Sequence, residues 1–229
     1  MTIPERYHVE PIPTELTHPF ILLSHYAHRI PPITYAFGLY FGLNLKGICT
    51  FGRPIAHGLI KYAFQGKYQD QFIELNRLVV VDKLERNVLS FFVAQALKML
   101  PSPTVVVSYA DTAQNHFGFI YQATNWSYTG FSVDRADGFI KGLEKKHYTS
   151  ISDHFGRGVK DKSEAMKRMY GDKFYYKRRS RKHRYFYFIG NKKERKEMKS
   201  LLIYPVLPYP KGDPSRYQTQ KVLTLKRLI

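Results

Sequence analysis

A strand–helix–strand pattern between residues 72 and 109 constrains the fold of this 229-residue chain more than any other feature. Residues 72–81 alternate at first and then run continuously apolar, which is typical of a strand buried on both faces of a sheet. Residues 87–100 carry apolar side chains at helical spacing and end before Pro101, and residues 104–109 form a second apolar strand. One long helix between two central strands indicates an α/β fold.

Shorter elements are predicted on both sides of this pattern. Residues 1–19 contain four prolines and no steady period, which favours an extended lead-in. We expect a short helix over 20–29, strands over 35–43, 46–51 and 128–133, and a helix over 113–124. Beyond these, the sequence predicts helices over 164–170 and 192–202 and a strand over 184–189.

Positive charge is concentrated at the C-terminal end. Residues 1–140 contain 11 Lys and Arg against 10 Asp and Glu, whereas residues 141–229 contain 25 against 8. Nearly all of the formal charge of +18 therefore lies in the second part. Such segregation favours a core joined to a surface for a polyanion, and nucleic acid is the partner we expect. We predict a catalytic core over 1–140 and a basic DNA-binding region over 141–229, whose strand at 184–189 completes the same domain.

Basic residues with interleaved tyrosines fill the segment from 173 to 199, which holds 12 Lys and Arg. Cationic side chains neutralise phosphates, and tyrosines stack on unstacked bases. An alternative is that this run is only a solvated face. We assign the aromatic side chains of 184–189 to the core and the basic run to DNA phosphates through Lys177, Arg178, Arg179, Arg181, Lys182 and Arg184.

Several protein classes are disfavoured. No stretch reaches the ~18–20 uncharged residues that a membrane-spanning helix needs. The N-terminus lacks the basic-then-apolar pattern of a signal peptide. The one cysteine, Cys49, excludes an internal disulfide framework and a cysteine-based zinc site. We therefore expect a cytoplasmic protein without a membrane partner.

The block from Ser108 to Gly130, which contains Asp111, Tyr121 and Trp126, is the most specific pattern in the chain. It resembles the Mom-like DNA modification proteins of phages, which have a GNAT-like fold, that of the acyl-CoA N-acyltransferases. The resemblance extends in order over 47–54, 74–78, 87–90, and 182–190 with 209–211.

This resemblance implies a GNAT-like mixed central sheet flanked by helices, with a basic C-terminal extension. It implies an enzyme that alters the exocyclic amine of adenine in double-stranded phage DNA within an infected bacterial host. The product would be of the methylcarbamoyl type, which host restriction endonucleases fail to cut. Because base chemistry requires the target to leave the duplex, a pocket with stacking aromatic side chains is expected.

The resemblance also implies acetyl-CoA or a related acyl donor, with its pyrophosphate at the start of the helix over 87–100. The expected donor contacts are Arg86, Asn87, Ser90 and Arg77. The glycines of the acetyltransferase phosphate loop are absent, because the residues from Arg86 to Ser90 stand in their place. This departure weighs against ordinary acetyl-CoA chemistry.

The candidate catalytic residues are Asp111, Tyr121, Ser108, Tyr26 and His25. Asp111 closes a buried strand, where it could orient the adenine amine, accept its proton, or simply cap the next helix. Tyr121 could donate to a leaving thiolate, stack on the base, or pack in the core. For Arg77, Glu74 competes as a structural partner with a donor phosphate or the DNA backbone.

A metal site is a further hypothesis. His25 and His28 lie one turn apart in the helix predicted over 20–29, so both rings could face one way. With Asp111, and with Tyr26 between the histidines, they would form a nitrogen-and-oxygen site of the kind that binds Fe²⁺. The alternative is two partly exposed histidines near a DNA backbone.

Two other functions stay open on the sequence. One is a conventional acyl-CoA-dependent N-acetyltransferase that acts on a protein or a small amine. The other is a non-catalytic DNA-binding module in which the α/β core is a scaffold.

Overall fold

The computed structural model describes residues 2–81, 84–143, 159, 161–213 and 225–226. The chain divides into two compact units. We call residues 1–131 and 182–229 the core unit, and residues 132–181 the insertion. Parts of the predicted basic region, 144–158, 160, 214–224 and 227–229, lie outside the described residues.

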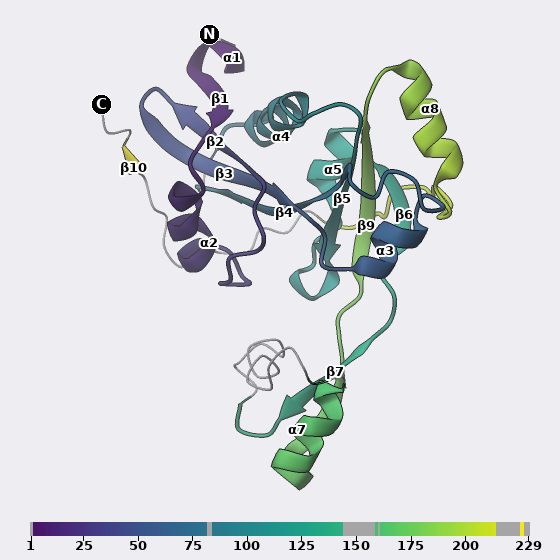
Figure 1. Cartoon of the computed structure of the whole chain (residues 1–229). Helices are drawn as coiled ribbons and strands as arrows, with labels where there is room; N and C mark the ends of the chain where they lie inside the picture. The colour runs from purple at the N-terminus through teal and green to yellow at the C-terminus, as the bar shows by residue number, and fades with distance from the viewer. Residues whose placement is uncertain (1, 82–83, 144–158, 160, 214–224, 227–229) are drawn as a thin grey trace. The chain divides into compact units, whose positions relative to one another are not determined.

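A mixed sheet of eight strands forms the core unit, in the order β1-β2-β3-β4-β5-β9-β6, with β10 paired to β3 (Figure 1). Among the described pairings, β4 and β5 run parallel and the others antiparallel. The strands are β1 Tyr7–Pro11, β2 Tyr35–Phe41, β3 Asn44–Gly52, β4 Phe72–Val80, β5 Thr104–Asp111, β6 Ser127–Phe131, β9 Lys182–Ile189 and β10 Leu225–Lys226.

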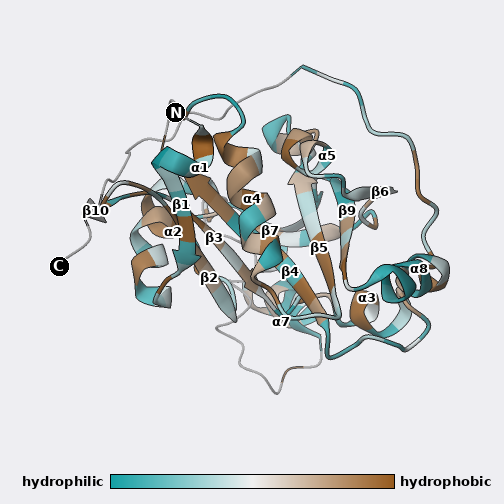
Figure 2. Cartoon of the chain, turned by 90° about the horizontal axis from the view of Figure 1, so that it is seen from above, coloured by the Kyte–Doolittle hydropathy of each residue, from teal (hydrophilic) through white to brown (hydrophobic). Residues whose placement is uncertain are grey.

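Helices cover both faces of this sheet. They are α1 Ile3–Arg6, α2 His18–Ser24, α3 His57–Tyr62, α4 Val88–Lys98, α5 Phe119–Ala123 and α8 Lys192–Leu201, with 3₁₀ turns at Thr14–Thr17 (η1) and Thr112–Gln114 (η2). Side chains of α4 and α5 pack with one set of alternating strand residues, and those of α2, α3 and α8 pack with the other set. The strands are largely apolar and α8 is largely hydrophilic (Figure 2).

The prediction of a mixed central sheet flanked by helices is confirmed. The strand–helix–strand pattern is present as β4, α4 and β5, and α4 buries Val88, Phe92, Val93, Ala96 and Leu97 against the sheet. The residues predicted as an extended lead-in contain β1, which pairs with β2. The sequence analysis did not predict α3.

The continuous helix predicted over 113–124 is wrong. η2 ends at Gln114 and is followed by Asn115, whose φ is 52°, and α5 begins after Gly118, whose φ is 72°. A Cβ on Gly118 would lie 2.5 Å from Cε2 of Tyr185. The chain therefore passes close to β9 with a left-handed residue at each end of the break, which a continuous helix does not allow.

The helix predicted over 20–29 is also too long, because α2 ends at Ser24. Residues 25–29 form a loop that is held by one hydrogen bond within it and by another from β4. The N–H of Ala27 donates to Nδ1 of His25 (3.0 Å), and Nη2 of Arg77 donates to the carbonyl of Arg29 (2.8 Å).

The insertion contains an antiparallel pair, β7 Ala136–Ile140 and β8 Phe174–Arg178, and the helix α7 Lys162–Tyr170, followed by a 3₁₀ turn at Gly171–Lys173 (η4). Ile140, Met166 and Phe174 pack together as a small core. The helix predicted over 164–170 is confirmed, whereas β7 and β8 were not predicted. The chain leaves the core unit after Phe131 and re-enters it at Lys182, where β9 lies between β5 and β6.

Candidate active site

The parallel strands β4 and β5 pair over only part of their length. Their register runs from Phe72 opposite Val105 to Glu74 opposite Val107, after which β4 continues beside β3 and β5 beside β9. β4 also carries a bulge at this point, between the residues that pair with Thr50 and Phe51. Such a break leaves backbone groups in the middle of a sheet without a ladder partner, which favours a functional site.

Two hydroxyl groups meet where the pairing stops. Oγ of Ser108 lies 2.8 Å from the carbonyl oxygen of Leu75 and 2.7 Å from the Tyr121 hydroxyl. A serine hydroxyl has one proton, so when Ser108 donates to the carbonyl, the Tyr121 hydroxyl donates to Ser108. Burial raises the pKa of Tyr121, so the phenol keeps its proton at neutral pH.

A group of ionisable side chains gathers around the same end of β4 and β5. The His25 ring stacks on Tyr26 (centroids 4.4 Å apart), and the Tyr26 ring meets His116 edge-on (6.5 Å). The charges of Lys182 and Asp111 act on this aromatic pair. We call this set the polar cluster, and its members are His25, Tyr26, Glu74, Arg77, Asp111, His116 and Lys182.

Asp111 holds a fixed position at the end of β5. Its side chain is 9% exposed, and Oδ1 accepts a hydrogen bond from the N–H of Ala113 (3.0 Å). Oδ2 lies 3.2 Å from Nζ of Lys182. The capping role proposed from the sequence is therefore present, and it leaves the carboxylate oriented by two partners.

His25 and Tyr26 have strongly altered acidities. Burial, reinforced by the positive charges of Arg77 and Lys182, lowers the pKa of His25 to about 3, so its imidazole is neutral at neutral pH. Burial and the negative charge of Asp111 raise the pKa of Tyr26 to about 12. Both rings are therefore uncharged, which suits them for packing against an aromatic ligand.

Glu74 is a member of the cluster that the sequence analysis considered only as a partner for Arg77. Burial raises the pKa of this half-buried carboxyl group to about 7, although the charges of Lys182 and Arg77 act in the opposite direction. A carboxyl group that titrates near neutral pH is suited to accept or return a proton. The signal in the sequence was an acidic residue between the apolar residues Ile73 and Leu75 of a predicted strand.

Arg77 contacts the loop after α2. Its guanidinium donates to the carbonyl oxygens of Arg29 (2.8 and 3.3 Å) and Asn76 (2.6 Å), and its charge acts on His25, Tyr26 and Glu74. These contacts place Arg77 in the polar cluster and give it a positioning role there. None of these partners supports the predicted contact of Arg77 with the acyl-CoA donor.

The iron site expected from the sequence is not assembled. Among the described residues, no group of three or more His, Cys, Asp and Glu side chains is placed to hold a metal ion. The physical reason is that His25 and His28 do not share a helix face, since α2 ends at Ser24 and His28 has a left-handed φ of 42°. Nδ1 of His28 lies instead 2.8 Å from the carbonyl oxygen of Leu22.

A groove of about 630 Å³ lies beside α4, on the face of the sheet that α5 also covers. Asn87 and Ser90, two of the predicted donor contacts, line it at the start of α4. Asn87 has a left-handed φ of 68°, and Oγ of Ser90 donates to its carbonyl oxygen (2.9 Å). The exposed Arg86 does not line the groove. Phe91, Ala94, Thr124 and Tyr187 are among the other residues that line it.

The residues predicted to contact DNA lie in three different environments. Lys177, Arg178, Arg179 and Arg181 are exposed and belong to the insertion. Lys182 belongs to the polar cluster. The prediction for Arg184 is wrong, because its side chain is 5% exposed and its guanidinium donates to Oγ1 and the carbonyl oxygen of Thr129 (both 2.9 Å) and lies 3.5 Å above the Tyr204 ring.

Comparison with known proteins identifies the family. The model of the Mom protein family matches residues 6–211. This chain belongs to the Mom protein family. It is 27% identical over 217 residues to the protein named methylcarbamoylase Mom of Escherichia phage Mu, covering 89% of this chain and 83% of that protein.

Solved structures similar to this Mom family member include three acetyltransferases. That of Bacillus cereus has a TM-score of 0.40 at 8% identity, with 80% of this chain and 96% of that chain covered. The Bacillus subtilis enzyme in complex with CoA has a TM-score of 0.36 at 12% identity (80% and 98% covered). The Elizabethkingia anophelis enzyme with acetyl-CoA bound has a TM-score of 0.34 at 9% identity (81% and 99% covered).

None of the helices in the described parts of the chain is long and apolar enough to span a membrane.

Proposed function

We propose that this chain is a DNA-modifying transferase that adds a methylcarbamoyl-type group to the exocyclic amine of adenine and thereby protects DNA from restriction endonucleases. The observation that carries the proposal is the polar cluster at the break between β4 and β5, in a chain of the Mom family. The name methylcarbamoylase given to the phage Mu protein supports the type of product.

The groove beside α4 fits a donor of the acyl-CoA class in size, since ligand pockets commonly measure ~300–1,000 Å³. Asn87 and Ser90 would hold its phosphates with the first backbone amides of α4, which have no partner inside the helix. Tyr187 and Phe91 would contact its apolar arm. To give a methylcarbamoyl product by direct transfer, the donor would carry that group on its sulfur, and when bound it would supply an electrophilic carbonyl carbon and a thiolate leaving group.

The polar cluster would receive the adenine. The exocyclic amine is a weak nucleophile because its lone pair is shared with the ring, so it needs an oriented acceptor for its hydrogens. The anchored carboxylate of Asp111 would orient the amine, and Glu74 would take the proton that is lost when the new N–C bond forms. Tyr26, stacked on a neutral His25, would offer a ring face to the extruded base.

The hydroxyl pair of Ser108 and Tyr121 would stabilise negative charge that forms on the donor side of the reaction. These groups lie where β4 and β5 part, and their protons stay in place at neutral pH. The Tyr121 hydroxyl would turn its proton from Ser108 toward negative charge that develops at this point, while Ser108 stays bonded to the Leu75 carbonyl.

Mass spectrometry of nucleosides from the DNA of a bacterial host that makes this chain tests the proposal. We expect a modified deoxyadenosine, whose added mass identifies the donated group, and resistance of that DNA to endonucleases with adenine in their sites. Asp111→Asn, which keeps a cap for Ala113 but removes the charge, should lower the yield at least about a hundredfold.

Asp70→Ala is the matched control, because the Asp70 side chain is 92% exposed. The proposal is overturned if folded, abundant protein leaves only the four normal nucleosides in the DNA. In that case, turnover of acyl-CoA with amines in the absence of DNA would favour a conventional acetyltransferase.

A further inference from the structure

The insertion presents two different faces. Along β7 and β8, the residues Gly138, Ile140 and Phe174 point toward α7, where Ile140 and Phe174 pack with Met166. A Cβ on Gly138 would lie 2.5 Å from the Phe174 ring and 3.4 Å from Cε of Met166. Because side chains alternate along a strand, the residues between these point to the other side of the ribbon. We call that side the outer face.

The outer face combines aromatic and basic side chains. Phe139 and Tyr175 are paired across the strands, and their rings stack at 6.0 Å with 27° between the planes. Next along the ribbon, Lys177 stands opposite Asp137, and Arg179 follows. Tyr175 is 37% exposed although it is a large aromatic residue, and Lys177 is exposed.

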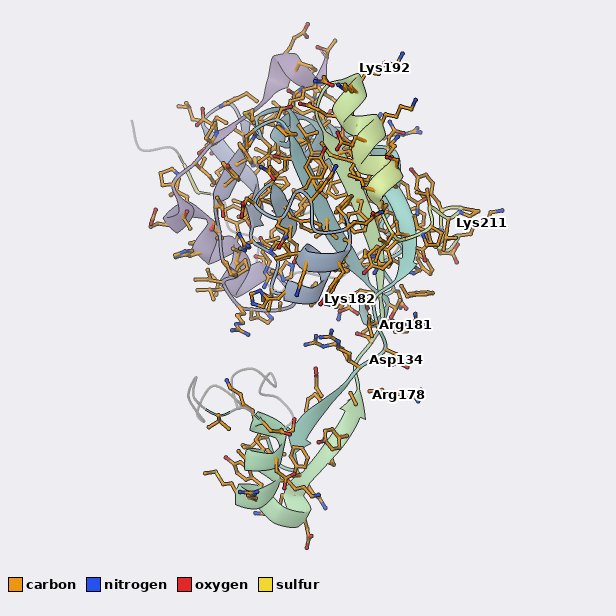
Figure 3. The ribbon with its side chains drawn as sticks, turned by 45° about the vertical axis from the view of Figure 1, so that its right-hand side comes forward. Asp134, Arg178, Arg181, Lys182, Lys192 and Lys211 are labelled. Carbon is orange, nitrogen blue, oxygen red and sulfur yellow. The ribbon has the colours of Figure 1, made fainter. Side chains whose placement is uncertain are left out.

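The carboxylates on this ribbon balance only part of its charge. Arg179 pairs with Asp137 (2.9 Å), and Arg178 pairs with Asp134 (3.8 Å). Asp134 and Arg178 are labelled in Figure 3. The Arg179 side chain is 44% exposed and the Arg178 side chain 86%, so water screens the attraction of each arginine to its carboxylate. A phosphate can therefore replace the carboxylate at little cost, while Lys177 adds a further cation.

We infer that the outer face of the β7–β8 ribbon binds duplex DNA, with Lys177 and Arg179 on phosphates and the Phe139–Tyr175 pair against base edges. The inference rests on the proposed function in taking DNA as the substrate, and it assigns the contact to a place outside the polar cluster. A two-stranded ribbon is of a size that enters the major groove, where apolar side chains contact the thymine methyl group. Cations that flank the aromatic pair on the same ribbon fit the phosphates that border such a groove.

Binding of the full-length chain to a fluorescent duplex, followed by anisotropy over a range of salt concentrations, tests this inference. The double variant Lys177→Gln with Arg179→Gln should weaken binding about tenfold or more near 0.15 M salt. It should also lower the slope of log K against log salt by about 2, since each lost phosphate contact removes ~0.9.

Lys192→Gln with Lys196→Gln is the matched control, because it removes the same charge from the exposed side of α8, the other basic surface (Lys192 is labelled in Figure 3). We expect this double variant to change affinity less than about threefold. Equal losses in both variants would mean that binding follows net charge, and an unchanged ribbon variant would mean that DNA contacts another surface. Either result overturns the inference.

The aromatic pair needs a separate variant. Tyr175→Ser removes the apolar ring that would contact base edges, so it should lower the affinity for duplex while leaving the affinity for heparin, a polyanion without bases, unchanged. Equal losses for both ligands would remove the base contact from the inference. Far-UV circular dichroism verifies that each variant is folded.

Base modification is measured separately, by nucleoside mass spectrometry of DNA from a host that makes each variant, so the two ideas fail in different ways. Tight, ribbon-dependent binding with no modified base leaves the inference standing and removes the proposed function. Modified bases together with binding that does not depend on the ribbon would support the proposed function and overturn the inference.

Discussion

At the scale of single residues, the environment of a charged side chain decides its role more than its place in a motif. Arg184 lies in a run of basic residues, yet its guanidinium is occupied inside the core unit by Thr129 and Tyr204. Glu74 lies in no charged run, yet it is one of the groups that titrate near neutral pH. The sequence showed residue types, and the partners decided what they do.

Glu74→Gln has a pH-dependent effect on stability. The pKa of Glu74 is raised from 4.5 to about 7 in the folded chain, so the stability it confers is fully present below pH 4.5 and is lost as the pH rises through 7. The amide has no charge to bury, so the variant should melt above the wild type at pH 8 and close to it at pH 4.5. Thermal melts at both pH values measure this, and a variant that melts below the wild type at pH 8 would show that the carboxylate is stabilising.

Arg184→Lys should affect stability and not DNA affinity. Lysine cannot reproduce the forked hydrogen bonds to Thr129 or the stacking on Tyr204, so the free energy of unfolding should fall by about 1–3 kcal/mol. Urea unfolding measures this loss. The folded variant should bind duplex DNA within about threefold of the wild type, and a selective loss of binding at unchanged stability would restore Arg184 to the DNA surface.

At the scale of elements, strong periodicity predicted the long ones correctly and local contacts decided the rest. α4, β5 and β9 follow from apolar patterns that span many residues. The break before α5 and the early end of α2 depend on Tyr185 and Arg77, which are distant in sequence, so no local pattern contains them. The same errors misplaced the predicted iron site, whereas Ser108 and Tyr121, which lie in a strand and in a helix as predicted for these two positions, do meet.

Gly118→Ala tests how tightly the turn before α5 is constrained. The variant must place a Cβ 2.5 Å from the Tyr185 ring at a φ of 72°, so we expect a loss of at least about 2 kcal/mol in the free energy of unfolding. Gly42→Ala is the matched control, since its φ is 56° and a Cβ there meets nothing within 4 Å. Chemical unfolding compares the two, and equal losses would mean that backbone strain alone matters.

At the scale of the whole molecule, the chain combines a continuous sheet with a module inserted into one connection. β6 ends at Phe131, which pairs with His183 in β9, and the two rings lie 4.5 Å apart. The module between these residues has its own small core of Ile140, Met166 and Phe174. Charge segregation indicated a separate role for the C-terminal part, and the strand expected over 184–189 lies in the core sheet as part of β9. The β7–β8 ribbon that precedes it was not predicted.

Replacing residues 132–181 by a short glycine-containing turn should leave the core unit folded. Phe131 and His183 already stand opposite each other in an antiparallel pair, which a tight turn can close. Circular dichroism should report retained secondary structure, and anisotropy should report duplex affinity reduced at least about tenfold. A shortened chain that is unfolded would mean that the core unit depends on the insertion.

The closeness of Phe131 and His183 has a consequence for how members of such a family diversify. An insert whose two ends meet on neighbouring strands can be lengthened, shortened or exchanged while every strand keeps its register. With the DNA contact inferred for the ribbon, the place where the chain attaches to its target and the reaction there can then change independently. We expect relatives with the same sheet to differ most in length between these two residues, and a foreign recognition module grafted there to redirect the same chemistry to new positions.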